Sequence, residues 1–113
     1  MKIIALPEVR QYLKELSYIL YEKGYFVFED TSEKYVEELF HDIKTTLHIR
    51  LHKSAPKYFD KYGKGMEYAI FRKNKQTSWY IFFRVYRYNG EDIYLIRYIA
   101  NNHTISQYLQ PND

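Results

Sequence analysis

Two side chains in the last third of the chain offer the most chemistry. Arg84 stands in the run SWYIFFRVYRY, where strand alternation places it on the same side as Tyr80, Phe82 and Tyr86. An arginine among aromatic rings can hold a phosphate while the rings stack on bases. His103, in the segment NNHT, belongs to the one residue type that titrates near neutral pH and can act as a general acid or base. These residue types are typical of a surface that binds nucleic acid.

Each candidate also has a purely structural interpretation. Arg84 can be a surface arginine stacked on a tyrosine, and His103 can be a solvated histidine in a polar tail. Alternation predicts that Arg97 lies opposite Phe83 on the core face, with its charged end reaching water at the edge of the core. A bulge beside Arg97 would instead turn it to the opposite face.

The segment Lys53–Gly65 mixes basic and aromatic residues. Its basic members are Lys53, Lys57, Lys61 and Lys64, and its aromatic members are Tyr58, Phe59 and Tyr62. Such a mixture suits a groove for nucleic acid beside a sheet. It also suits an exposed loop whose aromatic residues anchor it to the domain.

The histidines earlier in the chain are weaker candidates. His41, His48 and His52 are predicted to share one face of a helix, and the pair four residues apart could reach one metal ion. No cysteine or HExxH pattern accompanies them, so we interpret them as a solvated helix face and predict no metal and no cofactor. The chain also has no GxGxxG, P-loop, nucleophile-elbow or paired-carboxylate motif, which leaves phosphate cradling by a glycine loop and acyl transfer unsupported.

Two aromatic strands, 78–88 and 92–99, must position these residues as a β-hairpin. Trp79, Ile81, Phe83 and Val85 share one face of the first strand, and Ile93, Leu95 and Ile99 share one face of the second. Pairing these two apolar sets requires a loop of odd length, so we predict a three-residue loop, Asn89–Glu91. The other face then carries Tyr80, Phe82, Arg84, Tyr86, Tyr88, Tyr94, Ile96 and Tyr98, and it is either half-covered by another layer or a binding surface.

The rest of the chain supplies a helical layer and further strands. We predict a strand at 2–6, helices at 7–23 and 31–52, a strand at 66–73 and a short final helical turn or extended tail at 104–109. The fold class is therefore α+β, an antiparallel helix pair packed on one face of a small, mainly antiparallel twisted sheet in the order β-α-α-β-β-β. The face with Trp79 is expected to meet the helices, which leaves the tyrosine and arginine face outward.

Length and composition limit the function classes. The 113 residues predict a single domain, 1–113. A net charge of +3 is compatible with nucleic acid or an acidic protein as partner. The absence of cysteine excludes disulfides and thiolate chemistry and fits a cytoplasmic location, and no apolar run is long enough to span a membrane.

The chain resembles the RelE/ParE superfamily, the toxin halves of bacterial toxin–antitoxin pairs. The order of elements is similar across nearly the whole chain, and residues 66–109 are the most specific part. They comprise a strand ending IFRK, the strand WYIFFRVY, which is similar to the family's YRxxYxV-like strand, and IYLIRYI leading into the polar segment ANNHTISQYL.

The resemblance implies a compact microbial-RNase-like fold and an antitoxin whose peptide wraps the toxin. In ribosome-dependent members, basic residues on the sheet hold mRNA phosphates, and a C-terminal histidine or tyrosine assists cleavage by the ribose 2′-hydroxyl. In ParE-like members the target is DNA gyrase and no nuclease chemistry is needed.

The family's functional positions carry over in part. Arg72 matches the basic position that closes the family's second strand, and Arg97 lies late in the last strand. His103 falls where RelE-like members keep Lys, Arg or His, and Tyr108 falls where some members keep a catalytic aromatic residue.

One position departs from the family. Tyr80 stands where RelE-type nucleases often place an arginine, and Arg84, two positions further on the same strand face, is the substitute we expect. We therefore predict His103, Arg84 and Tyr108 as catalytic residues. The predicted substrate-binding residues are Arg72, Arg97, Lys53, Lys57 and Tyr80.

The expected function is that of a toxin with a cognate antitoxin as partner, acting as an endoribonuclease on ribosome-bound mRNA. Tyr80 favours a first alternative, a non-enzymatic ParE-like toxin that inhibits DNA gyrase by protein–protein contact. The second alternative is a binding module of the same fold without toxicity.

Overall fold

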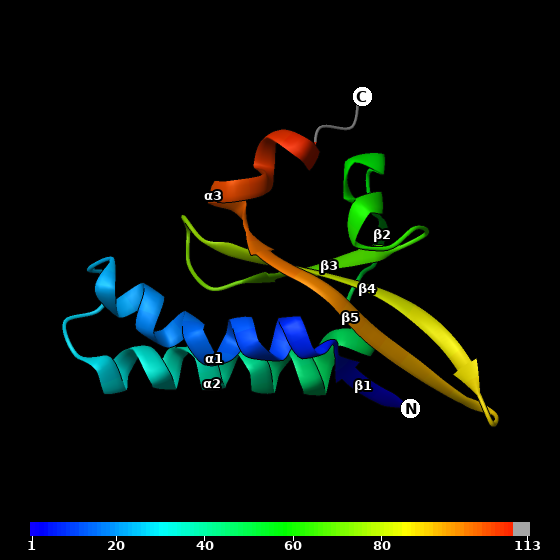
Figure 1. The fold of residues 1–113 in the computed structure, drawn as a ribbon, viewed down its shortest axis with the longest axis horizontal. Helices are drawn as coiled ribbons and strands as arrows, with labels where there is room; N and C mark the ends of the chain where they lie inside the picture. Colours follow the sequence, from blue (N-terminus) through cyan, green and yellow to red (C-terminus); the bar gives the residue numbers. More distant parts are fainter. Residues whose placement is uncertain (110–113) are drawn as a thin grey trace.

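The computed structural model describes residues 1–109. Two helices pack on one face of a five-stranded mixed sheet, which confirms the predicted α+β class (Figure 1). The strands run in the spatial order β1-β5-β4-β3-β2, with β1 parallel to β5 and every other pair antiparallel. The strands are β1 (Lys2–Ala5), β2 (Lys53–Ser54), β3 (Glu67–Arg72), β4 (Ser78–Tyr88) and β5 (Glu91–Asn101). The helices are α1 (Pro7–Glu22), α2 (Glu29–Thr46) and α3 (Asn102–Ile105), with 3₁₀ segments η1 (Leu47–Ile49), η2 (Lys57–Tyr62) and η3 (Ser106–Leu109).

Helix α1 matches its prediction closely, whereas α2 is shorter than predicted. The α2 helix gives way to a 3₁₀ turn after Thr46, whose hydroxyl bonds back to the carbonyl of Asp42 at 2.7 Å. Arg50 then folds back, donating to Asp42 at 2.9 Å and lying 3.7 Å above the ring of Phe71. These contacts turn the chain toward β2, a two-residue strand that the sequence pattern did not predict. No helix within residues 1–109 is long and apolar enough to cross a membrane.

The β4–β5 hairpin closes differently from the prediction. Tyr88 pairs with Glu91, so the loop has two residues, Asn89 at φ 50° and Gly90 at φ 75°. Positive φ at both positions is the type I′ geometry, whose twist matches that of the flanking strands, and Asn-Gly adopts it readily. The three-residue loop was therefore wrong.

A β-bulge then restores the predicted register in the other half of the hairpin. Phe83 pairs with Ile96 and Phe82 with Tyr98, so Arg97 is the extra residue. Beyond the bulge Ile81 faces Ile99, as predicted. On the turn side of the bulge the faces are exchanged: Tyr94 and Ile96 join the helix-side core, and Ile93 and Leu95 pair with Tyr86 and Arg84 on the other face.

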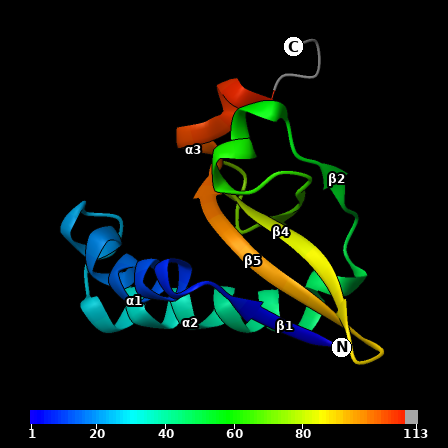
Figure 2. The same cartoon turned by 45° about the vertical axis from the view of Figure 1, so that its right-hand side comes forward.

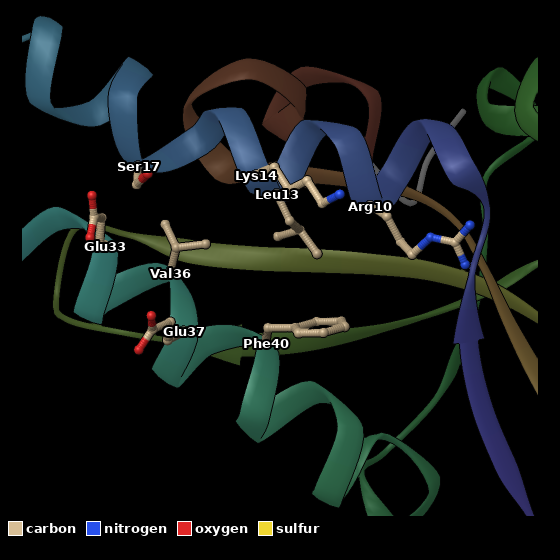
Figure 3. A pocket seen from close by; sticks show the side chains of 8 residues that line it. All are labelled: Arg10, Leu13, Lys14, Ser17, Glu33, Val36, Glu37 and Phe40. Carbon is tan, nitrogen blue, oxygen red and sulfur yellow. The ribbon is translucent and has the colours of Figure 1, made fainter.

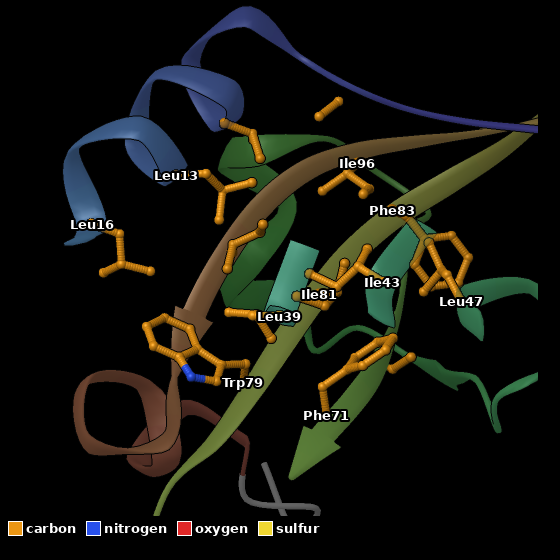
Figure 4. Packing of buried hydrophobic residues seen from close by; sticks show 14 of the residues in the cluster. Leu13, Leu16, Leu39, Ile43, Leu47, Phe71, Trp79, Ile81, Phe83 and Ile96 are labelled. Carbon is orange, nitrogen blue, oxygen red and sulfur yellow. The ribbon is translucent and has the colours of Figure 1, made fainter. Parts of the chain in front are cut away.

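The sheet has a hydrophobic core on each face. The helix-side core contains Trp79, Ile81 and Phe83 under the buried leucines of α1 and α2 (Figure 4). The second core contains Phe59, Met66, Tyr68, Phe82, Ala100 and Ile105. Segments η2, α3 and η3 cover it, on the side of the sheet away from the helix pair (Figure 2). The expectation that the tyrosine face looks outward was therefore wrong for the half that Phe82 occupies, because Phe82 is fully buried.

Candidate functional site

Arg84 lies on the exposed part of the sheet face that points away from the helix pair, which we call the second face. Its Nη1 atom donates to the backbone oxygen of Lys64 at 3.0 Å, and its guanidinium lies 5.5 Å from the centre of the Tyr86 ring. The side chain has further N–H groups and stays exposed. The structure thus places Arg84 among aromatic residues, as predicted, with a loop carbonyl that holds it in position.

Arg97 points to the second face because of the bulge. Its Nε atom donates to the backbone oxygen of Tyr62 at 2.8 Å, and Gly63 lies against its side chain. The placement of Arg97 on the helix-side core was therefore wrong. A one-residue bulge reverses the side to which the following residues point, and alternation alone does not reveal it.

Two tyrosine stacks attach η2 to the C-terminal part of the chain. Tyr58 lies parallel to Tyr108 with 3.7 Å between ring centres, and Tyr62 lies parallel to Tyr98 at 3.8 Å. Lys61 donates to the hydroxyl of Tyr58 at 2.9 Å, a bond that lowers the pKa of Tyr58, while the Tyr58 hydroxyl raises the pKa of Tyr108. Tyr108 therefore holds η3 against η2.

Asparagine side chains position His103. Asn101 caps α3 by accepting from the backbone N–H of His103 at 2.9 Å. Asn102 accepts from the backbone N–H of Ser78 at 2.9 Å and donates to the backbone oxygen of Gln76 at 3.0 Å. The His103 ring is exposed, and its Nε2 atom lies 3.3 Å from the hydroxyl of Thr77.

His103 lines a cleft of about 640 Å³ between the helix pair and the ends of β4 and β5. Several aromatic side chains line it, and Trp79 donates to the Tyr35 hydroxyl at 2.9 Å there. Burial raises the pKa of Tyr35. Lys23 also lines the cleft, and Lys73 lies 5.1 Å from the Tyr35 ring. The cleft therefore combines one imidazole with the cation of Lys23 and several aromatic faces, and Lys73 lies nearby against Tyr35.

A second cavity of about 520 Å³ adjoins this cleft and contains Arg97. Tyr12, Asn101 and Thr104 line both cavities, so the two cavities are direct neighbours. They follow the outer edge of β5 beyond Ile96, where pairing with β1 ends. We call the two neighbouring cavities together the β5-edge groove; His103 lines one of them and Arg97 lines the other.

The predicted catalytic residues do not meet. Thr77, the contact of His103, precedes the first residue of β4, and Arg84 lies seven positions further along the chain. At about 3.3 Å per residue in a strand, roughly 20 Å separates Arg84 from the His103 end of the sheet. One phosphate cannot contact both side chains.

The remaining predicted residues are dispersed. Arg72 pairs with Ser78 at the His103 end of the sheet and donates to the backbone oxygen of Asn74 at 3.2 Å. Tyr80 is half-buried on the second face beside Tyr68. Lys53 and Lys57 are exposed on β2 and at the start of η2.

The basic-aromatic segment 53–65 is anchored by its aromatic residues. Phe59 is fully buried and stacks on Phe82 at 4.4 Å between ring centres, while Tyr62 stacks on Tyr98. Lys57, Lys61 and Lys64 remain exposed around this anchor. The loop thus matches its structural interpretation, and its lysines stay accessible.

The three early histidines do not share a helix face, because α2 ends before two of them. His52 contacts the carbonyl of Leu47 at 2.8 Å and lies edge-on to Phe83, and His48 is half-buried. Interpreting them as a solvated face was wrong for these two; His41 is exposed. Within residues 1–109 no group of three or more His, Cys, Asp or Glu side chains is placed to hold a metal ion.

Sequence patterns did not predict the helix-side members of the groove: Tyr12, Lys23, Tyr25, Phe26 and Tyr35. A signal was present in the run GYFVF after the first helix, where aromatic residues follow a helix-ending glycine. Their proximity to His103 depends on how the helix pair lies across the sheet, which no local pattern encodes.

No protein-family model, curated protein or solved structure matches this chain. The fold itself, with two N-terminal helices on a five-stranded mixed sheet, is compatible with the RelE/ParE superfamily.

Proposed function

We propose that the protein is the toxin of a toxin–antitoxin pair and cleaves mRNA on the ribosome. The observation that carries the proposal is the β5-edge groove, in which an exposed histidine beside several aromatic side chains lines one cavity and an arginine lines the neighbouring one. The net charge of +3 also favours a polyanionic target. The antitoxin is expected to neutralise the toxin by covering this surface.

In this proposal the ribose 2′-hydroxyl gives up its proton to water as its oxygen attacks the adjacent phosphorus in line. The bond from phosphorus to the 5′-oxygen breaks, which leaves a 2′,3′-cyclic phosphate. His103 is the proposed general acid, which donates its proton to the leaving 5′-oxygen. Arg97 and Lys23 bind the negative charge of the phosphates along the groove. Aromatic rings such as Tyr35 and Tyr25 stack on bases.

The roughly 20 Å between Arg84 and His103 changes the part proposed for Arg84. Arg84 with Lys57 and Lys64 would contact a neighbouring stretch of RNA or the ribosome. Arg72 is closer to His103 and remains a candidate for phosphate binding. Tyr108 serves the site indirectly, through its stack on Tyr58.

The test is controlled expression in bacteria. We expect growth arrest with rapid loss of translation and cleaved mRNA. His103→Ala should relieve the arrest, whereas Arg84→Ala should only weaken it, and co-expression of the antitoxin should abolish it. Translation arrest by His103→Ala at the wild-type level would contradict the catalytic assignment.

A specific observation favours a second candidate, a toxin that inhibits DNA gyrase by contact alone. The separation of Arg84 from His103, together with Tyr80 in place of a basic residue, removes the arginine expected beside a nuclease centre. Induction of DNA damage with translation intact would support this candidate. Harmless expression without any partner would overturn both toxin proposals.

A further inference from the structure

A second groove lies between α1 and α2 on the side away from the sheet, far from His103. Its volume is about 450 Å³. In Figure 3 the strands pass behind the two helices, and the side chains of the groove face the viewer. The floor is formed by Leu13 and Val36, which are buried, and by the half-buried ring of Phe40.

The two walls of this groove carry opposite charges. Arg10 and Lys14 stand on the α1 side, and Glu33 and Glu37 stand on the α2 side. All four are exposed, and none of them forms a salt bridge with any residue in the range 1–109. The groove therefore offers an apolar floor between one free basic wall and one free acidic wall.

The charges lie at matching heights along the helices. The Ser32 hydroxyl donates to the backbone oxygen of Ser17, which places these two residues at one level. The helices are antiparallel, so residues before Ser17 and residues after Ser32 extend in the same direction. At 1.5 Å per residue, Glu33 lies about 1.5 Å, Lys14 about 4.5 Å, Glu37 about 7.5 Å and Arg10 about 10.5 Å from that level. Each basic side chain is thus about 3 Å in height from an acidic one.

We propose that this groove is the interface of a homodimer, in which the helix pairs of two copies form a four-helix bundle. The two-fold axis runs parallel to the helices, above the groove. Rotation about it carries α1 of one copy over α2 of the other and leaves every height along the axis unchanged. Arg10 and Lys14 of each copy then face Glu33 and Glu37 of its partner, and the Phe40 rings become buried.

The alternative two-fold arrangement is disfavoured by the same charges. An axis perpendicular to the helices, in the plane of the interface, would set α1 on α1 and α2 on α2. Basic residues would then face basic residues, and acidic would face acidic, which opposes association. A single amphipathic helix from another protein would need matched charges on both of its edges, whereas a second copy supplies them by symmetry.

Charge reversal tests the proposal. One variant carries Arg10→Glu with Lys14→Glu, and the other carries Glu33→Lys with Glu37→Lys. We expect the wild type to dimerise in sedimentation equilibrium and each variant to raise the dissociation constant roughly tenfold or more, because like charges then face each other. An equimolar mixture of the two variants should form a heterodimer with affinity near that of the wild type, since both contacts are again complementary.

The matched control for Arg10→Glu with Lys14→Glu is Lys34→Glu with Lys75→Glu, which makes the same change of net charge at exposed positions outside the groove. It should dimerise like the wild type. Recovery of the heterodimer also demonstrates that both reversed variants are folded. A wild type that stays monomeric at the highest concentrations measured, a dimer insensitive to either reversal, or a mixture that fails to associate would each overturn the proposal. The proposal does not depend on the activity proposed above.

Discussion

The Nε atom of Arg97 donates to the backbone oxygen of Tyr62 at 2.8 Å, which links the bulge of β5 to the end of η2. The bulge turns Arg97 out of the helix-side core, and the Tyr62 carbonyl accepts a hydrogen bond from one N–H group of its guanidinium. The Tyr62 ring meanwhile stacks on Tyr98, the next residue along β5. Through these two contacts η2 is fixed over the second core and forms part of the β5-edge groove.

Gly63 makes the close approach of Arg97 possible. Its φ is 149°, and an added Cβ would lie 2.9 Å from Cδ of Arg97. We expect Gly63→Ala to lower the free energy of unfolding by about 1–3 kcal/mol through backbone strain and this clash. Arg97→Ala should cost about 1–3 kcal/mol, because it removes a charged donor from the Tyr62 carbonyl.

Urea denaturation of the two single variants and the double variant measures the coupling. The cost of Gly63→Ala should be smaller in the Arg97→Ala background, where the clash is absent and only strain remains. An equal loss of free energy of unfolding in both backgrounds would contradict the inference that Gly63 makes room for the Arg97 side chain.

Asn102 should be critical for the position of His103. Asn102→Ala leaves the partly buried N–H of Ser78 without its acceptor, and we expect a loss of about 1–3 kcal/mol in the free energy of unfolding. Asn102→Asp keeps an acceptor for Ser78 but loses the donor to Gln76. The free energy of unfolding should therefore fall less in Asn102→Asp than in Asn102→Ala. Thermal unfolding measures both, and equal destabilisation by the two variants would show that the acceptor is not the important group.

Trp79 is the only tryptophan of the chain and reports on the cleft. It is almost fully buried, and its indole N–H donates to Tyr35. We expect Tyr35→Phe to shift its fluorescence emission to shorter wavelength, because the excited indole loses a polar partner, and to cost about 1–3 kcal/mol in stability. Tyr25→Phe, at an exposed tyrosine that lines the same cleft, is the control and should leave the emission unchanged.

Tyr98 should contribute to instability in alkali. Its pKa is raised from 10.0, chiefly by burial and then by the hydrogen bond with Tyr62. The unfolded chain therefore loses this proton at lower pH than the folded protein, so the stabilising contribution is complete below pH 10.0 and declines as the pH rises above it. In Tyr98→Phe the loss of stability above that pH should be shallower by up to about 1 kcal/mol per pH unit.

Urea denaturation over a pH series measures this effect. Between neutral pH and pH 9 the profiles of wild type and Tyr98→Phe should run parallel. Profiles that also stay parallel in stronger alkali would contradict a raised pKa for Tyr98.

The local sequence was sufficient to predict the helices, the main strands and the α+β class. Leu13 and Leu16 in α1, and Val36, Leu39 and Ile43 in α2, recur with the helical period and are buried as that period predicts. The strand 78–88 is equally clear, because alternation of aromatic and β-branched residues is a property of neighbouring residues.

The register of the hairpin required the whole fold. Asn89 and Gly90 prefer a two-residue turn, while Ile81 and Ile99 require odd-to-odd pairing further along. Both are satisfied only by a bulge, which the structure places at Arg97, opposite the step from Phe82 to Phe83. The sequence pattern shows that the turn and the strand pairing require different registers, but it does not locate the bulge that reconciles them.

The sequence by itself determined which residue types were available: an exposed arginine among tyrosines, a histidine after two asparagines, and lysines in a loop with aromatic anchors. Only the tertiary structure decided which of them share a surface. It separated Arg84 from His103 along the length of β4 and joined His103 to Arg97, Lys23 and Tyr35 in the β5-edge groove. The physical reason is that the period of a strand or helix assigns a side chain to a face, whereas distance between side chains depends on strand register, on the bulge and on the packing of helices over the sheet.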